Sequence, residues 1–430
     1  MSDLALMPEA AAPPAEASAP LRRAWPILIL LMLIYSFSWM DRFLLVISID
    51  PISRDLDVSN TEIGLLTGFG ASLLYALAGF PIARIADRRS RISVISIALG
   101  AWSAFTGAIG LASSFVMLAL CRFGIAAASA GCSPAAYSLI ADLFPPQRRG
   151  TAIAIYSLGI SIGTWAGLTL GGVAVEALGW RHAFLALGLP GLCLAAILFF
   201  LVREPTRDRF DAGSRAASKD YAPKEAIRFL LDRRAFVGIA LGFGLLSFAM
   251  SAFENWVPTY LIRAYGLGAA EVGSVSGLFQ GVTGIFGTLV FGILSDRLAR
   301  RDPRWYIRIP LACALVAVPI ILLFFLVPKN AAYACYFVIE LCASGYSAPL
   351  FAVSQMLLPP RLRAFGMAMM LFVLNVLGMG LGTFITGWTS DLIGGSGPAG
   401  GLGPAIMAMQ AVGLLGMLAL IDAIRTYRAD

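Results

Sequence analysis

The chain has few charged residues: Lys, Arg, Asp and Glu make up 13% of its 430 positions. A soluble globular protein carries about 25% charged residues, so this sequence lacks the polar surface that would keep it in water. It has a single histidine, His182, and six cysteines without the spacing of metal ligands. No Walker sequence or ATPase domain is present. The sequence therefore predicts no enzyme, no metal site, no cofactor and no ATP-driven machine.

A cleavable signal and a nucleic-acid partner are also not expected. Residues 1–24 are rich in Ala, Pro and Glu and lack a basic start followed by a short apolar core. We interpret them as a disordered cytosolic tail. Lys and Arg (32) outnumber Asp and Glu (25), but the basic residues gather in loops that belong on one side of a membrane. This pattern explains the positive charge without nucleic acid.

Long apolar runs dominate the rest of the chain, of which 59% is hydrophobic. A helix needs about 20 such residues to cross a hydrocarbon core of ~30 Å, and the alternating strands of a membrane barrel are absent. The sequence predicts an all-α membrane protein with twelve transmembrane helices. These are residues 25–48, 62–85, 91–112, 115–143, 150–175, 183–202, 235–261, 271–294, 306–327, 332–357, 364–389 and 402–424.

One basic segment, residues 203–234, divides the apolar runs into two sets of six. We expect a cytosolic linker there, between a bundle at 25–202 and a second bundle at 235–424, with a cytosolic tail at 425–430. Its last part, Pro223 to Arg234, is predicted to form a short amphipathic helix on the membrane surface. Because the basic loops lie on the side of the linker, both termini are expected in the cytoplasm.

An internal repeat supports two related halves. The matches are Glu62-Ile-Gly64 with Glu271-Val-Gly273, Asp87-Arg88 with Asp296-Arg297, and Pro145-Pro146 to Arg149 with Pro359-Pro360 to Arg363. The first two matches share an offset of 209 residues (271 − 62 and 296 − 87), and the third has an offset of 214 (359 − 145). Two pseudo-symmetric six-helix bundles, related by an axis along the membrane normal, are predicted from this repeat.

Charged residues inside the spans are the first candidates for function, because they are costly in a membrane. Asp41 and Arg42 lie in the first span and Arg122 in the fourth. Neighbours on a helix point about 100° apart, so at least one of Asp41 and Arg42 is expected to reach another helix, with Arg122 a candidate partner. Asp41 can take and release a proton, or the charges can form a fixed ion pair that locks the first helix.

Further candidates lie on other spans. Glu254 and Glu340 are intramembrane acids, and either can be a second protonation site or a structural hydrogen-bonding group. We assign proton coupling to Asp41, Arg42 and Glu254. Substrate binding is predicted for Arg42, Arg122, Ser129, Tyr346 and Asn375.

Charged turns end the second and eighth spans, where an aspartate can bond to the start of a helix in the opposite half. Such bonds would hold the cytosolic side shut and break when it opens, although these residues can also serve only as topology anchors. The candidate latch residues are Asp87, Arg88, Arg91, Arg149, Asp296, Arg297 and Arg363.

Several of these motifs together resemble the major facilitator superfamily, and specifically its spinster-like branch, over nearly the whole chain. They are Met40-Asp41-Arg42, Thr61 to Gly68, Ala86-Asp87-Arg88 with Arg91, Pro145-Pro146 with Arg149, Arg203-Glu204-Pro205, and Arg301 to Trp305. The resemblance implies the fold of that superfamily and alternating access by rocking of the two halves. It also implies proton-linked or facilitated movement of amphiphiles, such as sphingoid phosphates or lysophospholipids in eukaryotic relatives.

Two departures from the family pattern stand out. Ser129 occupies a position where spinster-like proteins often have a glutamate, so Asp41 or Glu254 would have to carry the proton alone. The first charged turn has Ala83 and Ser90 at positions where the family motif has glycine.

From these observations we expect a monomeric secondary active transporter of the bacterial inner membrane. It would move an amphiphilic or lipid-like organic anion with proton coupling, and its partners would be this substrate, protons and membrane lipids. The alternative is a proton-coupled importer of a small aromatic or sugar-derived acid. A membrane enzyme or sensor would need a catalytic cluster or a signalling domain, and the sequence contains neither.

Overall fold

The structure is a computed structural model that describes residues 18–202, 204–205, 223–359, 362–395 and 397–427. Apart from turns, these residues are helical, and no strand is found among them. The first half contains α1 (Ser18–Leu56), α2 (Asn60–Gly64), η2 (Leu65–Phe69), α3 (Gly70–Arg88), α4 (Arg91–Ile109), α5 (Phe115–Ser129), α6 (Cys132–Leu143) and α7 (Pro146–Leu201). The second contains α8 (Pro223–Asp232), α9 (Arg234–Tyr265), α10 (Ala269–Ala299), α11 (Trp305–Phe324), α12 (Lys329–Ala343), α13 (Ser347–Met356), α14 (Arg363–Phe372), η5 (Val373–Leu381), α15 (Gly382–Ile393) and α16 (Leu402–Thr426).

Eleven continuous helical segments of the described chain are long and apolar enough to cross a membrane. One of them, α7, has 56 residues, which would be about 84 Å long if straight, far more than a bilayer core of ~30 Å. It turns back at Gly179, whose φ of 78° is outside the helical region and suits a residue without a side chain. The segment therefore makes two passes, and the predicted twelve-helix, all-α architecture is confirmed.

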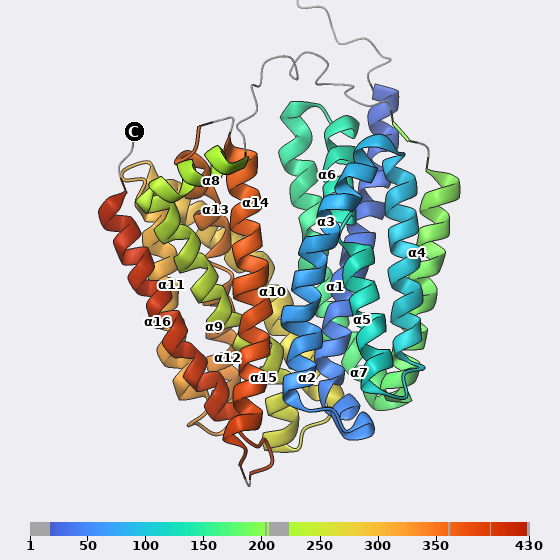
Figure 1. Ribbon diagram of the computed structural model, residues 1–430, viewed down its shortest axis with the longest axis vertical. Coiled ribbons are helices and arrows are strands. Elements are labelled where there is room, and N and C mark those ends of the chain that lie inside the picture. The colour runs from blue at the N-terminus through green and yellow to red at the C-terminus, as the bar shows by residue number, and fades with distance from the viewer. Residues whose placement is uncertain (1–17, 203, 206–222, 360–361, 396, 428–430) are drawn as a thin grey trace, which may run out of the picture.

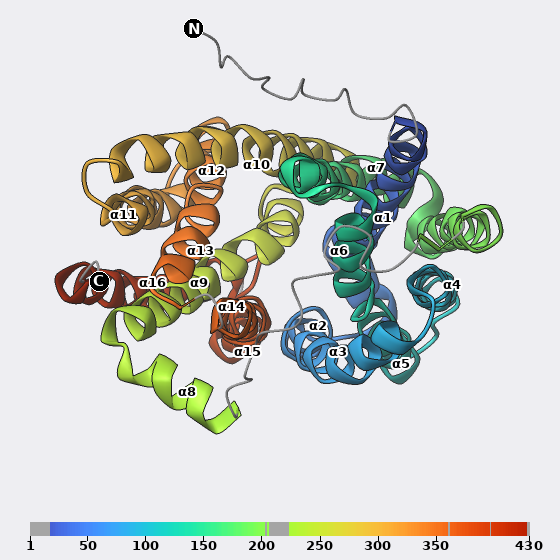
Figure 2. The same cartoon turned by 90° about the horizontal axis from the view of Figure 1, so that it is seen from above.

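The helices form two groups, α1–α7 and α9–α16, that lie beside each other (Figures 1 and 2). We call the end of the molecule where α1 begins and α16 ends the terminal face, at the top of Figure 1. The other end, where α1 finishes at Leu56 and α16 begins at Leu402, is the opposite face. The ribbons of the two groups diverge toward the terminal face and approach each other toward the opposite face.

Glycines of the sequence repeat pack the two halves together. A Cβ atom on Gly68 would lie 2.5 Å from the carbonyl oxygen of Gly380 on η5, and one on Gly64 would lie 3.0 Å from that of Thr383 on α15. The equivalent residue in the second half, Gly273, packs as closely on the backbone of Leu168 on α7. The repeat therefore marks two equivalent contacts, α2–η2 with η5–α15 and α10 with α7, in which only glycine permits this backbone approach.

Acidic side chains complete the same two contacts near the opposite face. Asp391 at the end of α15 accepts hydrogen bonds from the backbone N–H of Thr61 (2.7 Å) and Asn60 (3.3 Å), at the start of α2. Glu176 on α7 accepts one from Ala270 N–H (2.8 Å), at the start of α10. Each acid thus caps a helix N-terminus of the other half, where negative charge is favourable.

The surface and interior agree with a lipid environment. Large apolar side chains on the outside of the bundles remain open, such as Leu77 (61% exposed), Phe200 (79%) and Leu418 (60%). Soluble proteins seldom expose apolar surface of this extent. Asp41 and Arg122, by contrast, are 2% and 7% exposed. The ionisable groups of the spans therefore lie inside the protein and away from the acyl chains.

Some helix limits differ from the sequence prediction because apolar periodicity does not detect caps and local breaks. α1 already begins at Ser18, within the segment expected to be a disordered tail. The fourth span is interrupted at Ala130–Gly131 and the tenth at Ser344–Tyr346. Ser59 and Glu62 form a capping box at the start of α2, and the linker helix expected over 223–234 is α8, Pro223–Asp232.

Candidate functional site

A buried ion pair joins the first and fourth spans. Nη1 of Arg122 on α5 lies 3.3 Å from Oδ2 of Asp41 on α1, and the hydroxyl of Thr106 on α4 donates to Oδ1 of Asp41 (2.7 Å). The expectation that Asp41 reaches another helix is therefore met by Arg122. Thr106, which sequence reasoning missed, can be recognised only as one of many polar residues on an apolar span.

Both side chains of this ion pair are buried. Removing one partner of a buried pair leaves an uncompensated charge, at a cost of about 3–5 kcal/mol. The Nε of Arg122 is also buried and has no hydrogen-bond partner within the described residues. The arginine therefore retains hydrogen-bonding capacity that Asp41 does not use.

Arg42 is differently placed from its neighbour in sequence. It is half-buried, and its guanidinium lies 5.4 Å from the ring centroid of Trp39. No hydrogen bond or ion pair to Arg42 is found in the part of the chain that the structure describes. Its electrostatic neighbours include the half-buried acid Glu254 on α9. Arg42 is thus a cation with guanidinium donors available to another anion.

Aromatic rings extend from this cation along α1 toward the terminal face. Tyr35 stacks on Tyr156 of α7 with ring centroids 4.5 Å apart, and Tyr137 of α6 meets Tyr156 edge-on at 5.3 Å. Trp39 contacts both Tyr35 and Phe43. A cation, Arg42, beside several aromatic rings can bind a molecule with an anionic end and an apolar body.

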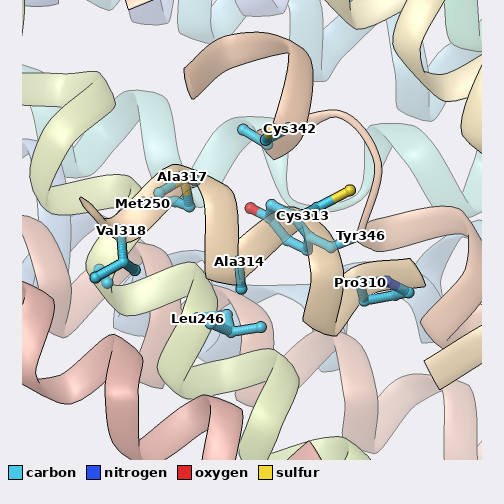
Figure 3. Close-up of a pocket in the computed structure, with 11 residues that line it drawn as sticks. Leu246, Met250, Pro310, Cys313, Ala314, Ala317, Val318, Cys342 and Tyr346 are labelled. Carbon is cyan, nitrogen blue, oxygen red and sulfur yellow. The ribbon is translucent and has the colours of Figure 1, made fainter. Parts of the chain in front are cut away.

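The other predicted substrate-binding residues do not converge on this ion pair. Ser129 hydrogen-bonds to the carbonyl of Ala126 (3.3 Å) at the end of α5, and Asn375 to that of Leu371 (2.8 Å) in η5. Tyr346 lies in the second half among apolar residues that line a cavity of about 20 Å³ (Figure 3). That volume can hold one water molecule but no substrate.

The candidate latch residues are spread over the terminal ends of the helices. The side chains of Asp87 and Arg88 lie outside the described residues. Asp296 accepts a hydrogen bond from Tyr306 of its own half (2.8 Å), while Arg297 is exposed. Arg149 and Arg363 each donate to carbonyls just before their own helices, those of Ala141 and Phe144 for Arg149 and that of Leu358 for Arg363.

Arg91 belongs to a cluster within the first half. Its guanidinium pairs with Asp142 at the end of α6 and with Glu204 after α7, with 2.8 Å between Nε and Oε1 of Glu204. Glu204 also accepts from Ile92 N–H (3.0 Å) and Ser90 hydroxyl (2.8 Å). The cluster therefore ties α4, α6 and the end of α7 together at the terminal face. The sequence contained Glu204 in a family motif but did not reveal its partner.

We expect acid to release this cluster. Partial burial raises the pKa of the Glu204 carboxyl, but hydrogen bonds from Ile92, Arg91 and Ser90 lower it by more, so that it lies below the usual value of 4.5. A depressed pKa stabilises the folded state fully above about 4.5 and no longer does so once the pH falls below the folded pKa. Glu204→Gln should therefore be less stable than the wild type near neutral pH by about 1.5–3 kcal/mol. Melting curves in detergent should converge in acid, and a pH-independent difference would contradict this assignment.

A second polar network links the halves at the opposite face. Arg263 at the end of α9 donates to Asp50 of α1 (2.8 Å) and to the side-chain oxygen of Asn60 (3.0 Å), and Asn60 donates to Ser390 of α15 (3.2 Å). Asp50 is also paired with Arg54 at 2.9 Å. None of the sequence motifs singled out Arg263, because its partners lie on distant segments of the chain.

Two related six-helix bundles, joined at one face and containing a buried ion pair between membrane spans, are the arrangement of a membrane transporter. The family model described as Major Facilitator Superfamily matches residues 31–383. The chain belongs to this superfamily and, within it, is spinster-like; it is a transporter and not an enzyme.

Individual relatives agree with this placement. The chain is 34% identical over 411 residues to an MFS-type efflux pump of Mycolicibacterium smegmatis, covering 95% of this chain and 94% of the relative. It is 29% identical to a sphingosine-1-phosphate transporter of Danio rerio over 384 residues, or 82% of this chain and 73% of the other. Among solved structures, a bacterial homologue of the human lysosomal transporter Spinster in an inward-facing, occupied conformation superposes with a TM-score of 0.84 at 28% identity, covering 95% and 98% of the two chains.

Proposed function

We propose that this protein is a proton-coupled secondary transporter that moves an amphiphilic organic anion. The observation that carries the proposal is the pairing of Asp41 with Arg122 beside Arg42, which has no ion-pair partner among the described residues. Asp41 can take up a proton and release Arg122, and it can lose the proton and pair with Arg122 again. Arg42 can bind the anionic group of the substrate. Glu254 supplies a second acid near Arg42.

The aromatic rings beside Arg42 support the amphiphilic part of the proposal. The half-buried rings of Tyr35 and Trp39, with the buried ring of Tyr156 stacked behind Tyr35, place apolar surface next to a cation, which fits a lipid-like tail better than a sugar acid. The sphingosine-1-phosphate transporter of Danio rerio is named for a substrate of this kind. Export is supported as the direction by the Mycolicibacterium smegmatis relative, which is named an efflux pump.

We further propose that the protein lies in a bacterial inner membrane as a monomer, with both termini in the cytoplasm. Basic residues favour the cytoplasmic side, and in this chain they gather at the terminal face and in the linker. With that orientation the contacts at the opposite face seal the outer side, and the conformation is inward-facing. Alternating access then requires the caps of Asp391 and Glu176 on the opposite half to break.

Two arginines close together also favour a second candidate, a small organic acid held by Arg42 and Arg122. The hexuronate transporter of Bacillus subtilis is 26% identical over 280 residues, which is 65% of this chain and 66% of that protein. In this case Arg122 would release Asp41 to bind a carboxylate. The two candidates differ in whether the tail of the ligand contributes to affinity.

Transport into proteoliposomes with an imposed pH gradient tests the proposal. We expect uptake of a single-chain lysophospholipid with a phosphate headgroup, and little uptake of a hexuronate. Arg42→Gln should reduce uptake about tenfold or more, because a charge-assisted hydrogen bond contributes about 1.5–3 kcal/mol. Arg425→Gln, which changes an exposed arginine in the last turn of α16 at the terminal face, is the matched control. Uptake of the hexuronate without uptake of the lysophospholipid would favour the second candidate. An equal loss of uptake in both variants would show that Arg42 does not belong to the substrate site.

A further inference from the structure

The second half contains a buried acid, Glu340, that takes no part in the ion pair between Asp41 and Arg122. Glu340 on α12 is 5% exposed, and its Oε1 has no hydrogen-bond partner in the described part of the chain. No Arg or Lys described there forms an ion pair with it. An ionised carboxylate left in this environment would cost several kcal/mol, and such groups ordinarily become neutral instead.

The titratable neighbours of Glu340 do not supply a positive charge. Glu254 on α9 acts on it as a second negative group, and Tyr336 and Tyr346 are its other electrostatic partners. Tyr336 packs on Phe253, which precedes Glu254, with ring centroids 5.5 Å apart, and it accepts a hydrogen bond from Gln280 of α10 (2.9 Å).

The helices packed against α12 contribute no charge at the level of Glu340. The charged residues of α10 and α11 lie near the ends of those helices; they are Glu271, Asp296, Arg297 and Arg308. Those of α9 other than Glu254 are Arg234 and Arg263, also at its ends. Among the described residues, Glu254 is therefore the only charged group that faces Glu340.

A count of charges indicates how many protons the acids of the spans carry. The spans place three acids, Asp41, Glu254 and Glu340, and two bases, Arg42 and Arg122, away from the helix ends. Asp41 is balanced by Arg122, and Glu254 has Arg42 as its electrostatic neighbour. Glu340 then has no counterion in the part of the chain that the structure describes, and an excess negative charge is strongly disfavoured in a medium of low dielectric constant. Neutrality requires one proton on the acids.

We propose that Glu340 binds a proton in this conformation and, with Glu254, forms a second proton-carrying site in the α9–α12 region of the transporter. The step is a simple protonation: the carboxylate of Glu340 takes one proton, which gives a neutral carboxylic acid and breaks no other bond. When the halves move and Arg42 binds substrate, Glu254 loses its counterion and competes for the same proton. The site supplies the coupling acid that Ser129 cannot provide. This role in transport rests on the proposed function, whereas the protonated state of Glu340 does not.

Infrared difference spectroscopy of the purified full-length protein in lipid tests the protonated state. Near neutral pH the wild type should show the carbonyl stretch of a buried carboxylic acid, and this band should be missing in Glu340→Gln. The band should persist near neutral pH in Glu254→Gln, the matched control, and should disappear there at a less alkaline pH than in the wild type, because the neighbouring negative charge that disfavours ionisation of Glu340 is gone. Absence of the band from the wild type, or its persistence in Glu340→Gln, would overturn the proposal. If Glu340→Gln does not fold, the downward shift of the band's pH midpoint in Glu254→Gln provides the test, and an unchanged or raised midpoint would overturn the proposal.

Transport distinguishes a proton carrier from a structural acid. Glu340→Gln imitates the neutral acid, so we expect it to retain substrate exchange and to lose at least tenfold in accumulation driven by a pH gradient. Unchanged accumulation, with the infrared band gone, would show that Glu340 is protonated but takes no part in coupling. A wild type that does not respond to the pH gradient would instead refute the proposed function, and the infrared result would still decide the state of Glu340.

Discussion

Asp41→Asn is expected to abolish substrate accumulation driven by a pH gradient while exchange of substrate between the two sides of the membrane continues. Exchange needs substrate binding and movement of the halves, but accumulation needs a group that releases a proton on one side. Asparagine keeps the shape of the side chain and can still accept from Thr106, which now donates to the carboxylate at 2.7 Å. It cannot ionise. Unaltered accumulation in this variant would remove Asp41 from the coupling mechanism.

The same substitution should also lower stability, because it leaves Arg122 buried without its 3.3 Å partner. We expect a loss of about 3–5 kcal/mol, visible as a lower melting temperature in detergent. The double variant Asp41→Asn with Arg122→Gln should regain part of it. Thr106→Val is the matched control: it keeps both charges, and it should lose about 1.5–3 kcal/mol, the contribution of one hydrogen bond to a charged group. If Thr106→Val abolished accumulation as fully as Asp41→Asn, geometry at Asp41 rather than its proton would be responsible.

Gly68→Ala is expected to shift the protein away from the conformation described here. The added Cβ would lie 2.5 Å from the carbonyl oxygen of Gly380 and 2.9 Å from Cβ of Thr383, so the contact between η2 and η5 cannot close without a backbone shift. Overpacking of this kind costs about 1–3 kcal/mol. Because the cost falls only on the state in which the opposite face is closed, the ratio of states should change roughly 5- to 150-fold.

Distances between spin labels at Asp57 and Ile393, one in each half near the opposite face, measure this shift. We expect longer distances to gain population in Gly68→Ala. The matched control is Gly79→Ala on α3, where the nearest atom to an added Cβ is 4.0 Å away. Identical distance distributions in the wild type and Gly68→Ala would mean that this glycine contact does not govern closure.

The contacts at the opposite face give a physical account of why this conformation is stable. Two helix N-termini are capped across the halves, by Asp391 and by Glu176, and the glycines beneath them allow backbone contact. The contact between α2–η2 and η5–α15 is also the place where both π-helical segments of the described chain meet. Segments of this type are often found at functional sites. The interface therefore combines two features. The hydrogen bonds of its helix caps can break and form again, and its glycine contacts are too close to admit a side chain.

Much of the architecture was predictable because it depends on short, continuous stretches of sequence. The apolar runs locate all twelve spans, since the hydrophobicity of about 20 residues decides whether a helix can lie in a bilayer. The glycines at 64 and 273 marked equivalent contacts because the two halves repeat one pattern. Asp41, Arg42 and Arg122 were recognisable as candidates because charges are rare within such spans.

The partners of those charges were decided only by the tertiary structure. Which side chain meets Asp41 depends on the rotation and crossing of α1, α4 and α5, and a helical repeat contains no information about either. For the same reason the sequence could not show that Arg91 joins Asp142 and Glu204, or that Arg263 joins Asp50. It also could not separate Glu254, near Arg42, from Glu340, which has no counterion among the described residues. Local composition determined which segments enter the membrane, and packing between distant segments determined which of their charges are balanced.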